Sequence, residues 1–169
     1  MPKSLFMVGN VNLLDCRKVA FLSSRKVHPS SVMKSYDWAT KVRDCGLCVI
    51  GGFQSALEKD VLKFLLDGGD QPIILVLARR MWNVVPKEFR DYVASGRMLV
   101  VSPVSQSISR VSQQSAMARN RYILENCDEA VFASIDPEGS LSRLLAEFPT
   151  LGYNVLEFVG CVPSEMPVR

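Results

Sequence analysis

The chain has 169 residues, of which 48% are hydrophobic and 22% charged, and its formal net charge is +3. This composition is typical of one globular domain and excludes a disordered, collagenous or low-complexity chain. A charge of +3 permits an anionic partner without requiring one. The apolar runs are far shorter than the about 20 residues of a membrane-spanning helix. The first residues reach Gly9 and Asn10 too soon for a signal-peptide core, so we expect a cytoplasmic protein with no membrane partner.

Five cysteines and a single histidine restrict the possible metal and nucleophile chemistry. Cys45 and Cys48 have C-x-x-C spacing, but they fall at an expected helix end and at the start of an expected strand. A redox pair would instead begin a helix, where the dipole lowers the thiol pKa. No second cysteine pair or histidine pair completes a zinc site, and His28 alone supports no catalytic triad. We therefore expect two structural thiols, no metal and no cofactor.

Short apolar runs alternate along the chain with segments of helical period. In chain order they predict a strand over 18–22, a helix over 29–46, a strand over 47–50, a helix over 57–66, a strand over 72–78, a helix over 86–94, a strand over 98–101, a helix over 112–126, a strand over 130–134, a helix over 139–148 and a strand over 153–158. Uninterrupted apolar strands are typical of parallel sheets covered on both faces.

This alternation predicts an α/β fold, a Rossmann-like doubly wound, mostly parallel sheet with helices on both faces. We divide the chain into an N-terminal arm over 1–14, a single domain over 15–160 and an irregular tail over 161–169. Trp38 lies among apolar helix residues and is expected in the core, whereas Trp82 follows two arginines in a loop and is a candidate for base stacking.

The loops that follow the expected strands are rich in small residues, hydroxyls and guanidinium groups. In open α/β sheets, ligands bind at the carboxyl ends of the strands, where the strand order reverses. Glycines allow close backbone approach, helix N-termini offer free N–H groups, and arginine supplies paired donors to phosphate. The pattern predicts a phosphate or nucleotide site, although glycine pairs are also common simply as turns. The candidate residues are Ser23, Ser24, Arg25, Gly51, Gly52, Gln54, Ser55, Arg79, Arg119, Asn120, Arg121, Gly139 and Ser140.

Arg119 and Arg121 compete for one role, because residues two apart do not share a helix face. One should face the site while the other pairs with an acid such as Glu125. We favour Arg119 with Asn120, and Arg121 is nearly equal. Arg25 is either a phosphate clamp or a solvated surface charge, and His28 is expected in a surface loop.

Four segments carry a resemblance to a known family. Gly9-Asn10 with Leu13-Leu14 and residues 19–25 resemble the "GN..LL....vaiVGSR" opening of DNA-processing protein A (DprA, also called Smf). Residues 48–53 resemble its "VVSGLARGID" segment, residues 119–132 its "RNRiIaglSdavlV", and residues 139–141 its "GSLiTA". The matches run in order over residues 9–146. Residues 52–60 look closer to small stand-alone relatives that share a "SGFHSxxEK" motif.

The resemblance implies a Rossmann-like fold of the SMF/DprA-LOG superfamily, binding to single-stranded DNA, and a homo-oligomer, in the form of a dimer. The chain departs from the family where Ser55 replaces an arginine, Glu58 an aspartate and Leu62 a histidine. We expect no counterpart of the winged-helix domain that some relatives carry. In the LOG branch of phosphoribohydrolases the catalytic loop reads PGGxGTxxE, and residues 136–143 hold no acid at the catalytic position.

Three functions follow from these observations. The leading one is a DprA-like protein that binds a nucleotide or single-stranded DNA through electrostatic contacts with phosphates, linked to DNA processing, uptake or recombination. The rival is a nucleotide-hydrolysing enzyme that uses Glu58 or Glu138 as its carboxylate. The third is a non-catalytic oligomeric scaffold with a vestigial pocket.

Overall fold

The computed structural model describes residues 5–156, which contain one seven-stranded sheet. The order across the sheet is β1-β5-β4-β3-β2-β6-β7. β1 is antiparallel to β5, and every other pair of neighbours is parallel. The strands are β1 (Phe6–Gly9), β2 (Lys18–Leu22), β3 (Cys48–Gly51), β4 (Ile73–Val76), β5 (Met98–Ser102), β6 (Glu129–Phe132) and β7 (Gly152–Val155).

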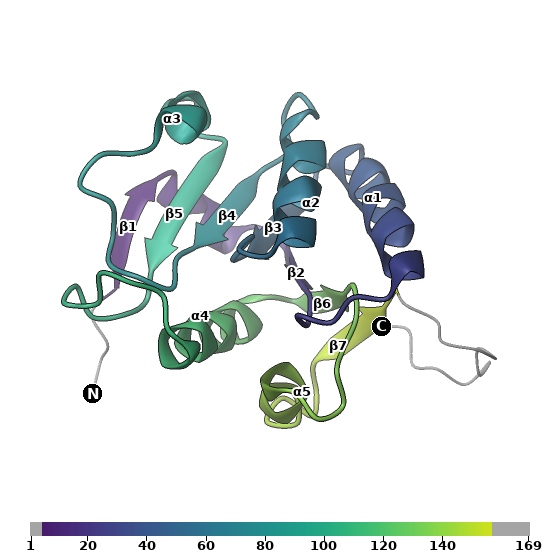
Figure 1. Cartoon of the computed structure of the whole chain (residues 1–169). Coiled ribbons are helices and arrows are strands. Elements are labelled where there is room, and N and C mark those ends of the chain that lie inside the picture. The colour runs from purple at the N-terminus through teal and green to yellow at the C-terminus, as the bar shows by residue number, and fades with distance from the viewer. Residues whose placement is uncertain (1–4, 157–169) are drawn as a thin grey trace.

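Helices cover both faces of this sheet, as predicted (Figure 1). The helices are η1 (Val11–Asp15), a 3-10 helix, and α1 (Pro29–Arg43), α2 (Ala56–Leu66), α3 (Lys87–Ala94), α4 (Gln113–Asn126) and α5 (Ser140–Leu145). α1, α2 and α3 pack on one face, and η1, α4 and α5 pack on the other. The Rossmann-like α/β fold expected from the sequence is therefore confirmed.

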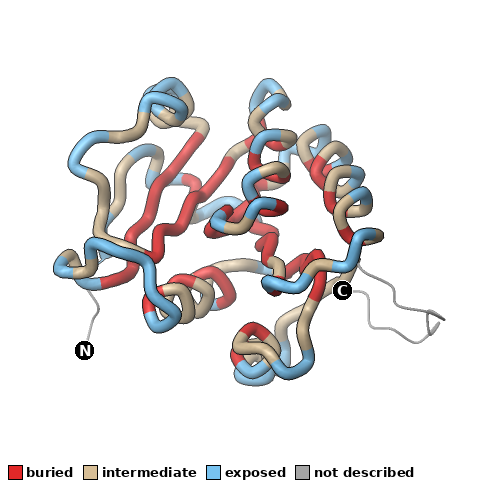
Figure 2. Tube along the Cα trace, in the orientation of Figure 1, coloured by how far each residue is buried: buried red, intermediate tan, exposed pale blue. Residues whose placement is uncertain are grey.

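The burial of the strands explains why their sequences do not alternate between apolar and polar residues. In β2, Val19 and Phe21 enter the core beneath α1 and α2, while Ala20 and Leu22 enter the core beneath α4. All five residues of β2 and of β5 are buried. Figure 2 shows the strands at the centre of the molecule as its most buried segments. Such strands need apolar side chains on both faces.

The N-terminal residues differ from the arm that the sequence suggested. Residues 6–9 form β1, which pairs with β5 at one edge of the sheet, and η1 follows directly and buries Leu13. Gly9 has a φ of 111°, and the backbone of Met98 lies against its Cα, so a side chain has no room there. Much of the range 1–14 therefore belongs to the sheet domain. The expected tail over 161–169 lies outside the described residues.

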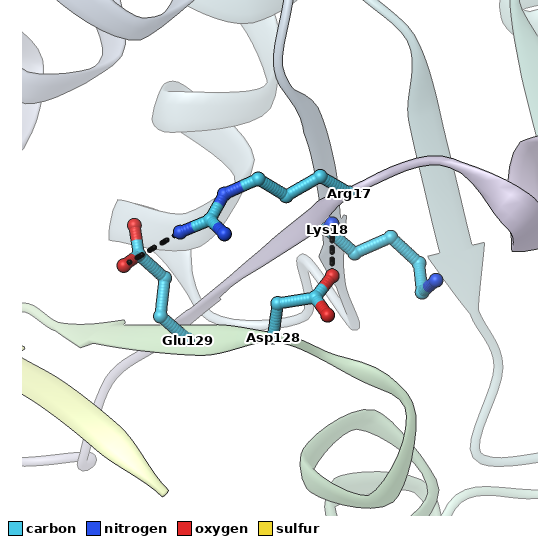
Figure 3. A network of polar contacts seen from close by, with 4 residues as sticks. All are labelled: Arg17, Lys18, Asp128 and Glu129. Atoms are coloured by element: carbon cyan, nitrogen blue, oxygen red, sulfur yellow. Dashed lines mark hydrogen bonds and ion pairs between the residues drawn. The ribbon is translucent and has the colours of Figure 1, made fainter.

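A polar network joins β2 to β6 at their amino ends (Figure 3). Arg17 forms an ion pair of 3.3 Å with Glu129, and the backbone N–H of Lys18 donates to the Asp128 carboxylate at 2.7 Å. The Lys18 ammonium donates to the carbonyl oxygens of Leu14 and Cys16. The contacts to Asp128 and Glu129 join β2 to its neighbour β6, which enters the sheet after a long excursion of the chain.

The strand order reverses between β2 and β6. From β2 the chain adds β3, β4 and β5 on one side, and it then returns to add β6 and β7 on the other. In open α/β sheets the connections on either side of such a switch point diverge, which leaves a crevice at the carboxyl ends of the strands.

Candidate functional site

A cavity of about 770 Å³ lies at this switch point, and we call it the switch-point cavity. Its walls come from the loops that follow β2, β3 and β6 and from the first turns of α4. The lining residues are Ser23, Ser24, Arg25, Gln54, Ser55, Glu58, Val111, Ser112, Gln113, Ala116, Met117, Arg119, Asn120, Asp136, Glu138, Gly139, Ser140, Leu141 and Arg143.

Ser24 ties together the two loops that border the switch point. Its backbone N–H donates to the Ser134 carbonyl at 3.0 Å, and its hydroxyl accepts from the Asp136 N–H at 2.9 Å. The Ser134 hydroxyl donates in turn to the Lys26 carbonyl. Ser24 is buried, so this small residue fixes the rim of the cavity, while Arg25 beside it is exposed on the cavity wall.

Arg119 is the central cation of the cavity. Arg119 is only 7% exposed to solvent. Burial lowers the pKa of its guanidinium, while the negative charge of Glu58 acts to raise it. Its hydrogen bonds go to two neutral amide oxygens, Asn120 Oδ1 at 3.2 Å and Gln54 Oε1 at 3.5 Å. Within residues 5–156 no carboxylate forms an ion pair with it. A buried guanidinium of this kind can bind an anion with its remaining donors.

Gly52, directly after β3, supports Arg119 from beneath. A Cβ on Gly52 would lie 2.7 Å from both Cδ and Nε of Arg119. Phe53, which follows, is buried and has a φ of 48°, a left-handed conformation that is costly for a residue with a side chain. The tight turn over 51–53 therefore brings the backbone directly under the guanidinium.

Three carboxylates share the cavity with three arginines, but two of the acids already accept backbone hydrogen bonds. Glu58 Oε1 accepts from the Ser55 N–H at 3.0 Å, and Asp136 Oδ1 accepts from the Glu138 N–H at 3.1 Å. Glu58 thereby completes a capping box with the Ser55 hydroxyl. This gives Glu58 a structural role at the start of α2, independent of catalysis. The Arg143 guanidinium donates to the Glu138 carbonyl oxygen at 2.9 Å.

The first residues of three helices face this cavity. Ser55, Ser112 and Gly139 are the N-caps of α2, α4 and α5, and all three line it. The positive ends of the helix dipoles add to the arginine charges. The arrangement as a whole favours an anionic ligand with several oxygens.

Nine of the thirteen residues predicted for the site line the cavity. They are Ser23, Ser24, Arg25, Gln54, Ser55, Arg119, Asn120, Gly139 and Ser140. Gly51 and Gly52 do not line the cavity, and Gly52 lies against Arg119, which does.

Arg79 and Arg121 lie outside the cavity. Arg79 Nε donates to the Arg80 carbonyl oxygen, in the loop after β4. Arg121 forms an ion pair of 2.6 Å with Glu147, and this hydrogen bond raises the pKa of Arg121 and lowers that of Glu147. Of the two competing arginines, Arg119 is the one at the cavity, and the acid paired with the other is Glu147 rather than Glu125.

Several wall residues were not predicted from the sequence, among them Ser112, Gln113 and Arg143. Ser112 had a usable signal, because it precedes the expected helix as an N-cap. Gln113 and Arg143 become wall residues only through the crossing of α4 and α5, which no local pattern encodes.

The aromatic and histidine candidates have structural contacts. Trp82 stacks on Phe89 at 5.9 Å between ring centroids and lines neither this cavity nor the second one described below. Trp38 stacks on Phe21 at 5.0 Å, at the edge of the core. His28 is exposed and caps α1, where its Nδ1 accepts from the Ser30 N–H.

Among residues 5–156, no three His, Cys, Asp or Glu residues are placed to hold a metal ion together. No helix in that range is both long and apolar enough to cross a bilayer.

Comparison with known proteins identifies the family. The structure aligns with DprA from Helicobacter pylori over 90% of this chain and 72% of that protein, at 21% identity and a TM-score of 0.68. The Helicobacter structure is described as showing a single-stranded DNA binding mode. The present chain also aligns with DprA from Streptococcus pneumoniae over 88% of its length at 20% identity and a TM-score of 0.67, and spans about half, 53%, of that protein.

A more distant likeness extends to other proteins of this fold. The molybdenum cofactor binding protein from Rippkaea orientalis matches 82% of this chain and 74% of its own at 10% identity, with a TM-score of 0.56. These similarities show a shared fold. No curated protein matches the sequence. The family model of DNA recombination-mediator protein A, however, matches residues 1–141, which confirms the resemblance drawn from the motifs: the chain belongs to the DprA family.

Proposed function

We propose that this protein binds single-stranded DNA, with phosphate groups of the strand held in the switch-point cavity. Membership of the DprA family supports this function, as does the single-stranded DNA binding described for the Helicobacter relative of the same fold. The proposed phosphate contacts are the predicted residues that line the cavity, chiefly Arg25, Arg119, Ser55 and the Gly139–Ser140 step.

The observation that carries the proposal is the state of the Arg119 guanidinium. It is buried at the cavity wall, its hydrogen-bond partners are neutral amides, and the backbone of Gly52 supports it from behind. Burial of a cation costs free energy that an internal carboxylate normally offsets. Here a phosphate oxygen would supply that charge, with strong charge-assisted hydrogen bonds.

Replacing Arg119 by alanine tests the proposal, with Arg121→Ala as the matched control one helical face away. Because charge-assisted hydrogen bonds to phosphate would be lost, we expect the DNA affinity of Arg119→Ala to fall by roughly tenfold or more relative to the parent chain. The affinity of the control should not change. Fluorescence anisotropy of a labelled oligothymidylate at two salt concentrations measures both. Affinity should fall with salt, because binding releases counterions, and more steeply in the parent chain than in Arg119→Ala.

Two results would contradict the proposal: no binding at low salt, or equal affinity for the parent chain and Arg119→Ala. Competition with nucleoside monophosphates distinguishes a site for a DNA strand from a site for a free nucleotide. If the cavity is a nucleotide site, the monophosphates should displace the labelled oligonucleotide at the same concentration of phosphate groups. Chromatography of the incubated nucleotide detects the rival hydrolysis directly, as a released base.

The homodimer implied by the resemblance and the cytoplasmic location expected from the sequence belong to the same proposal. Sedimentation of the purified chain measures the oligomeric state. A scaffold with a vestigial pocket would dimerise equally well but bind no DNA, so the two experiments together separate the alternatives.

A further inference from the structure

A second cavity of about 560 Å³ lies beside the first, at the carboxyl end of β5 and the amino end of the antiparallel edge strand β1, and we call it the edge cavity. This volume falls within the roughly 300–1,000 Å³ typical of small-ligand pockets. Its lining combines apolar surface from Phe6, Pro103, Val104 and Ile108 with polar side chains such as Gln114.

The edge cavity adjoins the switch-point cavity at the start of α4. Ser112, the N-cap of that helix, lines both. Successive residues then divide between them: Gln113 and Ala116 face the switch-point cavity, whereas Gln114 and Ala118 face the edge cavity. The first turns of α4 therefore form a ridge between two hollows.

The ridge and its flank carry positive charge and lack acids. No Asp or Glu occurs between residues 92 and 124, a span that includes Arg110 and Arg119. Arg110 is exposed two residues before Ser112. The backbone N–H of Arg80 donates to the carbonyl of Ile108, a lining residue, at 2.7 Å, so the main chain at Arg80 runs beside the edge cavity. A polyanion crossing the ridge would meet no carboxylate from this span.

The chemistry of the edge cavity suits an unpaired nucleobase better than a phosphate. Phe6 is 41% exposed and is the only aromatic residue among those that line it. Exposed aromatic rings stack bases in single-strand binding sites. Among the described residues no arginine or lysine lines the cavity, while the exposed Gln114 amide offers both a donor and an acceptor to the edge of a base.

We propose that the edge cavity is a second subsite for the same strand, which takes one unpaired base against Phe6 while the sugar-phosphate backbone crosses the α4 ridge beside Arg110. This inference rests on the proposed function of the switch-point cavity. It makes binding depend on strand length, because a short oligonucleotide fills the first cavity alone and a longer one reaches both.

Anisotropy titrations with labelled oligothymidylates of about 3 to 16 nucleotides test this, a range that brackets common single-strand site sizes. In the parent chain, affinity should rise in a step once the strand spans the ridge. Phe6→Ala should lower the affinity for long strands by at least about fivefold, which is the effect of losing one stacking contact between a base and an aromatic ring. The affinity for short strands should not change. Phe6→Trp should restore the step. The neighbouring Leu5→Ala is the matched control, since Leu5 is 44% exposed and does not line the cavity.

A second pair of variants tests the ridge without touching the cavity wall. Arg110→Ala should lower the affinity for long strands and reduce the magnitude of the slope of log affinity against log salt concentration by about 1. Arg17→Ala, at the amino edge of the sheet, should change neither quantity. Equal affinities of Phe6→Ala and the parent chain at every length would overturn the second subsite. So would a loss by Phe6→Ala that is the same for short and long strands. Absence of binding to short strands in the parent chain would instead contradict the proposed function itself.

Discussion

The contact between Gly52 and Arg119 shows why single residues at this site depend on one another. The sequence suggested that the glycine pair brings the backbone close to a ligand. In the structure the close approach is to a side chain, because the Arg119 guanidinium lies where a Cβ of Gly52 would be. The glycine therefore positions the cation that is proposed to bind phosphate.

Replacing Gly52 by alanine should displace Arg119. The added methyl group would lie 2.7 Å from Cδ and Nε of the arginine, so the buried side chain must move out of its place. We expect DNA affinity to fall about as far as in Arg119→Ala, since both changes remove the same donors. Combining the two substitutions should then cost little more than either alone, which a double-mutant cycle measures. Additive losses would show that Gly52 acts independently of Arg119.

At the scale of the element, the start of α2 shows how a helix end and a site share residues. Ser55 and Glu58 cap each other's backbone N–H groups, and both line the switch-point cavity. Where the family motif has arginine and aspartate, this chain has a capping box. The departure from the motif thus has a local structural reason, the stability of the helix N-terminus.

Two substitutions in this box separate structure from catalysis. Ser55→Ala should lower the free energy of unfolding by about 1 kcal/mol, because the cap hydroxyl is lost. Glu58→Gln should change it little, since glutamine can also occupy that position of a capping box. Urea denaturation measures both values. If Glu58→Gln abolished a nucleotide hydrolysis seen in the parent chain while leaving stability unchanged, the carboxylate would be catalytic and the binding function would not be the whole account.

The edge strand β1 is an element that the sequence did not reveal. Residues 6–9 are only four, and their burial ranges from exposed to half-buried, so they lack the uninterrupted apolar character of the central strands. Their strand conformation comes from antiparallel pairing with β5, whose paired residues lie at least ninety positions away in sequence. The central strands were predictable because their apolar runs are long enough to indicate burial on both faces.

For the molecule as a whole, buried thiols link stability to pH. Burial raises the pKa of Cys48 to about 12, and that of Cys127 also to about 12, while Cys45 is exposed. Cys45 and Cys48 therefore differ sharply in environment despite their C-x-x-C spacing. Both are free thiols.

The free energy of unfolding should therefore fall in alkaline solution. Below pH 9.0, the ordinary thiol pKa, Cys48 is protonated in both states. Between 9.0 and about 12 the unfolded chain loses this proton and the folded chain keeps it, so stability declines, by up to about 1.4 kcal/mol per pH unit. Urea titrations with reductant at several pH values measure the slope. Cys48→Ala should reduce it and Cys45→Ala should not; equal slopes in all three proteins would refute the link.

The sequence by itself determined the α/β fold, the order of its strands and helices after residue 18, the family, and the loops that carry most of the switch-point cavity. It could do so because burial on both faces, helix caps and short motifs are local patterns. Only the tertiary structure decided that Arg119 rather than Arg121 faces the cavity, that Gly52 supports it, that β1 completes the sheet and that a second cavity adjoins the first. Those outcomes depend on which segments, distant in sequence, meet at the carboxyl edge of the sheet, and contact between such segments is a property of the packed molecule.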